Sequence, residues 1–107
     1  MSLEDLAQDS LMVYGYAPQL YKMGEEAAEL AAAIGKYAAL AAFMRERGYT
    51  EELQNLQNKA WIGILDELCD VKIMLAQMEH EYGHLIELRM PAKLERAWSR
   101  VKEGKAE

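Results

Sequence analysis

The 107-residue sequence is poor in residues that end helices or cross-link chains, with two prolines and a single cysteine. Because Cys69 has no partner within the chain, no internal disulfide can form, and we expect a reducing compartment, the cytoplasm. Apolar and polar residues nowhere alternate over a run rich in β-branched residues, so no strand is indicated. These absences exclude a disulfide-stabilised scaffold and predict an all-α fold.

Basic residues are also scarce, and no apolar run is long and unbroken. The chain has 12 Lys and Arg against 18 Asp and Glu, a net charge of −6 and a pI near 5.0. With no basic stripe to offset this acidity, we expect no nucleic-acid polymer as partner. The longest apolar stretch, Ala27–Met44, is interrupted by Glu29, Gly35 and Lys36. We therefore expect no membrane span of roughly 20 residues, and we see no signal-peptide pattern at the start.

Helix-forming residues dominate what we interpret as a single domain, residues 1–107. The turn residues predict about four helices: Leu3–Tyr14 ending at Gly15, Pro18–Arg47 ending at Gly48, a third from the N-cap Thr50 to about Glu81 ending at Gly83, and a last one carrying Leu94, Trp98 and Val101. Pro91 either opens the last helix, which we favour, or kinks a helix begun near Leu85. A flexible tail is expected from about residue 104.

The two central helices are long for so short a chain. A helix of about 30 residues measures about 45 Å, whereas a compact chain of this size has a radius of gyration near 13 Å. Helices that overhang a compact monomer expose apolar flanks that need a partner. We therefore expect the long antiparallel hairpin to assemble into a larger helical bundle, as a homodimer or tetramer.

Two acidic pairs stand at the spacing i, i+3, namely Glu26 with Glu29 and Glu67 with Asp70. On a helix, this spacing projects both carboxylates from one face. Glu26 and Asp70 each lie 22 residues from Gly48, and Glu29 and Glu67 each lie 19 residues from it. Antiparallel helices joined by a short loop place such equidistant residues at the same height. We therefore expect Glu26 to face Asp70 and Glu29 to face Glu67.

All four acids fall within or beside the apolar stripes of their helices, where an uncompensated charge is very costly. Carboxylates in such places need cations, and oxygen ligands suit a hard divalent metal such as Mg²⁺, with Mn²⁺ as a substitute. Mg²⁺ held by a few carboxylates also binds phosphate oxygens, so a polyphosphate is the expected ligand. We predict that Glu26, Glu29, Glu67 and Asp70 are metal ligands and that activity requires the metal.

The segment Glu25-Glu26-Ala27-Ala28-Glu29, followed by Glu67-Leu68-Cys69-Asp70, resembles the EExxE…ExxD signature of the MazG-like all-α nucleoside triphosphate pyrophosphohydrolases. Gln19, Lys22, the Tyr82-Gly83 break, and Lys93 with Arg96 add to the likeness, which covers roughly residues 14 to 101 and is greatest to short single-domain forms from phages and mobile elements. One departure is the gap of 37 residues between Glu29 and Glu67, which is long for such domains and leaves the nucleobase preference open.

The resemblance implies hydrolysis of a nucleoside triphosphate between its α and β phosphates, giving the monophosphate and pyrophosphate. It also implies that the four acids hold Mg²⁺ and serve catalysis, with a ligand carboxylate or its neighbour as the general base, and that the protein clears unwanted nucleotides.

Four further side chains are candidates for binding the substrate. Lys93 and Arg96 stand i, i+3 and can bind phosphates, although basic residues on a last helix are often only solvated. Lys22 stands four residues before Glu26, so it either reaches a phosphate or only pairs with that carboxylate. Gln19, seven residues before Glu26, lies on the same face and can read a base edge.

Two rival interpretations remain beside the hydrolase. The first is a non-enzymatic helical module for dimerisation or interaction, whose acidic faces are merely solvated. The second is a di-iron carboxylate bundle, which needs Glu-x-x-His pairs. Glu29 and Asp70 stand where the histidines are required, so we discount it.

Overall fold

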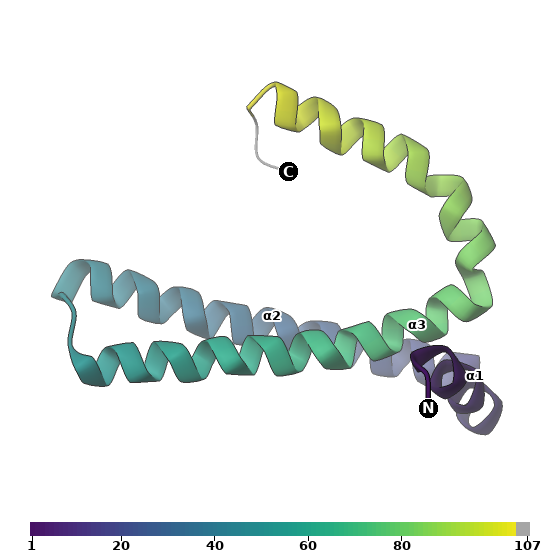
Figure 1. Ribbon diagram of the computed structural model, residues 1–107, viewed down its shortest axis with the longest axis horizontal. Helices are drawn as coiled ribbons and strands as arrows, with labels where there is room; N and C mark the ends of the chain where they lie inside the picture. Colours follow the sequence, from purple (N-terminus) through teal and green to yellow (C-terminus); the bar gives the residue numbers. More distant parts are fainter. Residues whose placement is uncertain (105–107) are drawn as a thin grey trace.

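The computed structural model describes residues 1–104 as three helices and no strands, which confirms the all-α prediction. Helix α1 spans Leu3–Tyr14, α2 spans Tyr16–Arg47 and α3 spans Glu51–Lys102 (Figure 1). The expected tail from about residue 104 lies, apart from Gly104, outside the described residues.

Local capping sets the helix ends. Ser2 Oγ accepts from the backbone N–H of Asp5 at 3.0 Å, and the Asp5 carboxylate accepts from that of Ser2, which forms a capping box before α1. Gly15 and Gly48 follow α1 and α2 with φ of +83° and +93°, a region that favours glycine. Helix α2 begins two residues before the predicted Pro18, because a proline in the first turn lacks only an N–H that has no intrahelical partner.

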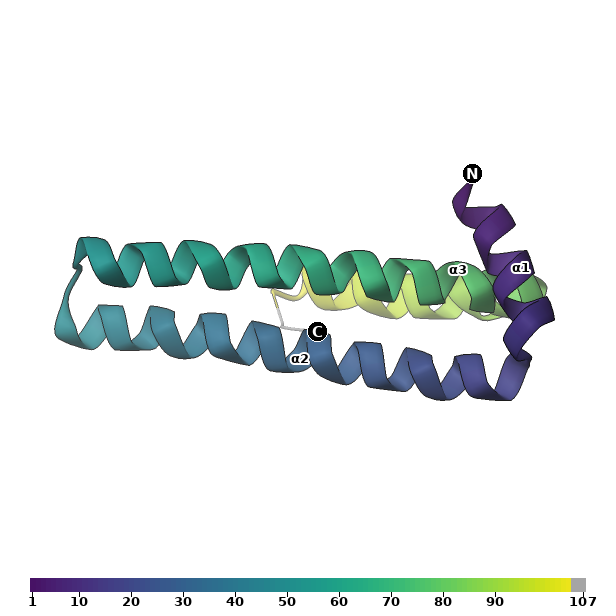
Figure 2. The same cartoon turned by 90° about the horizontal axis from the view of Figure 1, so that it is seen from below.

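Helices α2 and α3 run antiparallel over most of the length of α2 (Figure 2). Thr50 caps α3, its hydroxyl accepting from the backbone N–H of Leu53 at 3.1 Å. Helix α1 packs across the end of this pair that lies away from the turn (Figure 2). The buried apolar side chains come from all three helices and are few: Ala7, Met44, Ala60, Ile64, Met74 and Met78.

The predicted break at Gly83 is wrong, and so is the separate last helix, because α3 continues through both Gly83 and Pro91. Gly83 does not take the positive φ of a helix-ending glycine. Pro91 lacks the N–H that would bond to the carbonyl of Glu87, a loss that bends a helix. Figure 1 shows α3 turning through an arc in this part of the chain and then running back above the hairpin. Residues 84–102, which include part of this arc, are here named the arm. The described chain thus has three helices rather than four.

Helix α2 is long and apolar enough, by length and composition alone, to cross a membrane. Its most apolar window of 18 residues has a mean hydropathy of 1.3, and 6% of that window is buried. By length and composition α2 thus meets a criterion that we expected no segment to meet, and the expectation that no membrane is a partner stays a prediction. Core helices of soluble proteins meet the same criterion, although most of their surface is buried.

Candidate metal centre

The antiparallel pairing brings the two acid-bearing segments level with each other. One carboxylate oxygen each from Glu26 on α2 and from Glu67 and Asp70 on α3 lie within 4.8 Å of one another. Three of the four predicted ligands thus form one group. Three oxygens at such separations can share a cation.

Glu29, the fourth predicted ligand, is exposed but acts on Glu67. The pKa of Glu67 is raised above its ordinary value, first by desolvation and then by the negative charges of Glu29, Asp70 and Glu26. A side-chain hydrogen bond with Glu29 raises the pKa of Glu67 further. The site therefore favours a proton on Glu67 or, equally, a cation beside it.

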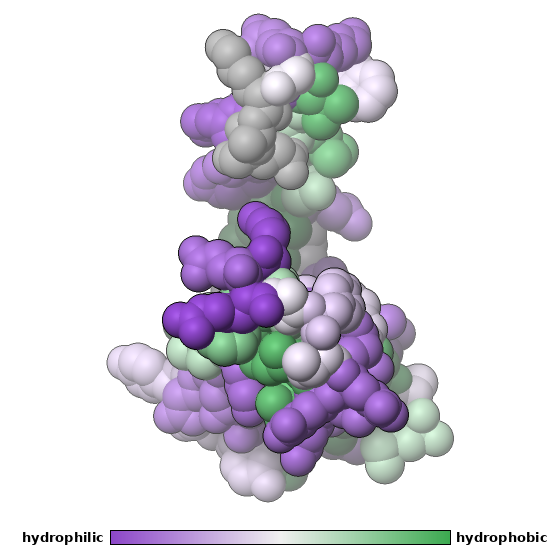
Figure 3. Space-filling model, turned by 90° about the vertical axis from the view of Figure 1, so that its left-hand side faces the viewer, coloured by the Kyte–Doolittle hydropathy of each residue, from purple (hydrophilic) through white to green (hydrophobic). Residues whose placement is uncertain are grey.

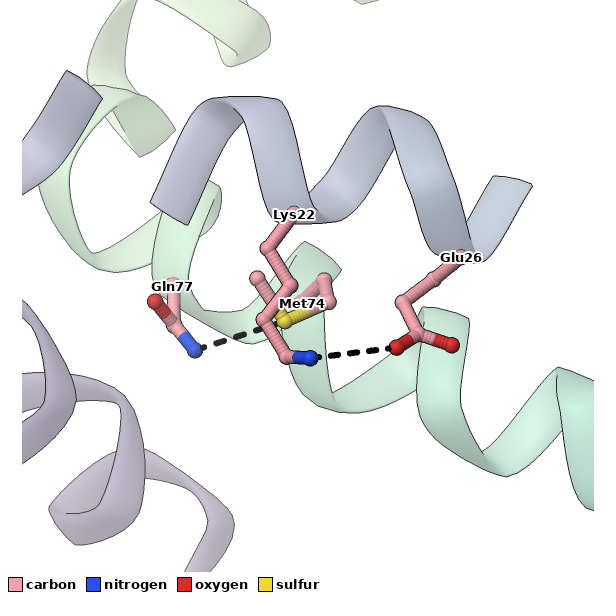
Figure 4. Close-up of polar contacts among 4 residues, drawn as sticks. All are labelled: Lys22, Glu26, Met74 and Gln77. Carbon is pink, nitrogen blue, oxygen red and sulfur yellow. Dashed lines mark hydrogen bonds and ion pairs between the residues drawn. The ribbon is translucent and has the colours of Figure 1, made fainter. Parts of the chain in front are cut away.

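Within residues 1–104, the carboxylates of Glu26 and Glu67 have too few partners to satisfy all their oxygens. Lys22 Nζ lies 3.4 Å from Glu26 Oε1, an ion pair that Figure 4 shows beside Met74, and the Glu26 side chain is 13% exposed. The Oε2 atoms of Glu26 and Glu67 are both buried and have no hydrogen-bond partner among residues 1–104. One lysine cannot balance these acids, so the oxygens fit a divalent cation in their number and chemistry.

A pocket with mostly apolar walls adjoins this group on the side of α1, and we name it the polar pocket after the amides and the lysine in its lining. It has a volume of about 530 Å³ and is lined by Leu6, Ser10, Tyr14, Pro18, Gln19, Lys22, Ile73, Met74 and Gln77. Gln19 and Gln77 are 6% and 2% exposed. The Gln77 amide donates to Met74 Sδ at 3.6 Å (Figure 4), while its Oε1 is buried with no partner in the described chain. The pocket therefore offers an amide oxygen to a donor from a ligand.

Sequence reasoning missed Gln77, although a signal for it was present. Gln19 and Gln77 each stand 29 residues from Gly48, so the same register that aligns the acids also aligns the two amides.

A second hollow extends from the acids toward the turn. This groove of about 720 Å³ is mostly apolar, with one carboxylate and two lysines: Ala33, Lys36, Ala39, Leu40, Phe43, Leu56, Lys59, Ala60, Gly63 and Glu67. The two lysines were not among the predicted site residues. They are the two cations that line this groove together with Glu67.

The structure does not bring Lys93 and Arg96 to the acids of their own chain. Both are exposed on the arm, which stands apart from the hairpin in Figure 1. Gln19 and Lys22, by contrast, lie in the polar pocket beside Glu26.

Comparisons of the chain with protein-family models, with curated proteins and with solved structures gave no match.

Proposed function

We propose that this protein is a Mg²⁺-dependent hydrolase that cleaves nucleoside triphosphates to monophosphates and pyrophosphate. The observation that carries the proposal is the group formed by Glu26, Glu67 and Asp70, in which two buried carboxylate oxygens lack partners. The likeness of these segments to the EExxE…ExxD signature supports the same chemistry. We also propose that the protein is a member of the MazG-like family, that it is located in the cytoplasm, and that it clears unwanted nucleotides.

The four acids, Glu29 included, would hold Mg²⁺, with Mn²⁺ able to replace it. The bound cation supplies neutralisation of phosphate charge and a lower pKa for water at the site. Without it, the acids repel a triphosphate, so the reaction depends on the metal.

The polar pocket is the proposed place for the nucleobase. Gln19 and Gln77 offer amide donors and acceptors for a base edge, and the volume of about 530 Å³ suits a small ligand. Lys22 lies between this pocket and Glu26, where its ammonium can leave the carboxylate and bind a phosphate. A bound nucleotide would thus lie along the hairpin, with its base in the polar pocket and its phosphates near Lys22 and the acids.

Incubation with a panel of ribo- and deoxyribonucleoside triphosphates and Mg²⁺, followed by a pyrophosphate assay, tests the activity. We expect release with at least one nucleotide and none after addition of a chelator. Glu67→Gln should abolish release and leave the helical circular dichroism signal unchanged, since it removes a charge that the fold accommodates poorly. Glu79→Gln, which changes an exposed glutamate elsewhere on α3, is the matched control and should retain activity. Absence of release from every nucleotide at high protein concentration would refute the proposal, and near-normal activity of Glu67→Gln would refute the ligand assignment.

The alternative is a non-enzymatic helical module for dimerisation or interaction. It is favoured by the exposure of Glu29 and Asp70 and by the many large apolar side chains left uncovered. For this alternative, we expect no pyrophosphate release and no effect of Mg²⁺ on the melting temperature.

A further inference from the structure

The arm carries an apolar stripe that the chain itself does not cover. Residues of this arm stripe recur at spacings of three and four: Ile86, Met90, Leu94, Ala97, Trp98 and Val101. Its large side chains are exposed, with Leu94 at 59% and Trp98 at 61%. Figure 3 shows apolar surface on one side of the arm and hydrophilic surface on the other.

A row of cations runs beside the arm stripe. Arg89, Lys93, Arg96 and Arg100 follow one another at spacings of four, three and four residues. Counting five basic and two acidic residues, segment 84–102 has a net charge of +3, whereas residues 1–83, with six basic and fourteen acidic, carry −8. The overall charge of −6 therefore hides two segments of opposite sign.

The surface of the chain is far too large for a compact monomer. Its accessible area is 8368 Å², against about 6,100 Å² for a compact monomeric protein of 12.2 kDa. If two chains both buried this excess of about 2,300 Å², the interface would cover about 4,600 Å² in total, within the range of obligate homodimers. The radius of gyration is 18.0 Å, against about 13 Å for a compact chain.

The large dimensions of the chain result from the separation between the arm and the hairpin. The chain measures 38 Å along its second principal axis, whereas two packed helical layers occupy about 20 Å. Figure 1 shows the arm and the hairpin as the two limbs of a hook. The extent of 38 Å thus reflects the separation of these two limbs.

We propose that the arm docks on the hairpin of a second copy of this chain, with the exchange reciprocal in a two-fold symmetric dimer. The arm stripe covers apolar side chains of the partner's α2 and α3, and the row of cations meets the acidic surface of that hairpin. This arrangement brings Lys93 and Arg96 to carboxylates that their own chain keeps apart from them.

Charge and symmetry single out a second copy as the occupant. An anionic membrane or nucleic acid would attract the arm but would be repelled by the −8 of the remaining chain. A second copy supplies an acidic apolar hairpin to each arm and receives an arm in return, so both exposed surfaces are covered at once and the assembly closes. The proposal does not depend on hydrolysis of any nucleotide.

Sedimentation equilibrium tests the arm stripe. We expect the wild type to have twice the monomer mass of 12.2 kDa. Leu94→Glu should give a monomer, whereas Leu88→Glu should remain a dimer. Leu88 is a matched control because it is a leucine of the same arm, 67% exposed, that lies outside the stripe. A monomeric wild type, or equal masses for the two variants, would overturn the proposal.

Cross-linking identifies which surfaces meet. Mixed ¹⁵N- and ¹⁴N-labelled protein is treated with a carbodiimide, which joins lysines to nearby carboxylates, and the peptides are identified by mass spectrometry. We expect Lys93 joined to a carboxylate of residues 1–83 in products that pair one labelled with one unlabelled peptide. Links from Lys93 that occur only within one copy, or only to the partner's arm, would contradict the exchange. Vesicles of anionic lipid added to the wild type should leave its mass unchanged, and binding to them would favour a membrane as the occupant.

Discussion

At the scale of single residues, Glu67 is the carboxylate whose surroundings oppose its ionisation most clearly. It lies level with Glu29, shares a group with Glu26 and Asp70, and has one buried oxygen without a partner. Each of these neighbours raises the pKa of Glu67, so the charges of the four acids destabilise the metal-free fold most when all four are ionised.

The raised pKa of Glu67 predicts how the stability of the metal-free protein depends on pH. Because the folded pKa of Glu67 is raised above 4.5, the folded state binds its proton more tightly than the unfolded state. The free energy of unfolding therefore gains from Glu67 as the pH falls from above the raised pKa toward 4.5. We expect the difference in stability between about pH 7 and about pH 5 to shift in favour of low pH more in the wild type than in Glu67→Gln. Urea unfolding in chelator at both values measures this.

If the proposed site binds Mg²⁺, adding the metal should have the complementary effect on stability. A cation competes with the proton for Glu67, so its stabilisation of the wild type should be larger at the higher pH. Identical pH profiles for wild type and Glu67→Gln would show that the carboxylate titrates normally.

At the scale of the helices, two glycines with opposite roles show what ends an element. Gly48 adopts φ +93° and ends α2. Gly83 keeps a helical conformation within α3, and a Cβ added there would meet nothing within 4 Å. The same residue type thus marks a turn in one place and only a weak point of a helix in the other.

This contrast predicts opposite effects of alanine. Gly83→Ala should raise the free energy of unfolding by about 0.5–1 kcal/mol, because alanine loses less backbone entropy on entering a helix. Gly48→Ala should lower it by about 1–2 kcal/mol, because an L residue is strained at positive φ. Urea unfolding of both variants provides the measurement. A destabilising Gly83→Ala would mean that helix α3 is interrupted there in solution.

At the scale of the whole molecule, the chain is open, with few buried apolar residues for three helices. Large side chains such as Phe43, Ile62 and Leu94 remain exposed. A monomer of this shape would bury too little apolar area to offset the entropy of ordering its long helices.

A second copy should therefore stabilise the fold by mass action. We expect the melting temperature of the wild type to rise with protein concentration over a hundredfold range, because dilution favours separated chains. Differential scanning calorimetry at several concentrations tests this. A melting temperature independent of concentration, with a monomer mass, would show that the open chain is stable alone.

The sequence by itself determined the helical class, the bounds of α1 and the C-terminal end of α2 at Arg47, because capping groups and glycines act locally. It also predicted the level placement of Glu26, Glu29, Glu67 and Asp70, since a short turn ties register to counting. Only the tertiary structure decided that α3 runs through Gly83 and Pro91, that Gln77 is buried beside Gln19, and that Lys93 and Arg96 lie away from the acids. The burial of Gln77 depends on packing between segments that are distant in the sequence. The local pattern at Gly83 and Pro91, in turn, does not contain the balance between a bent helix and a broken one.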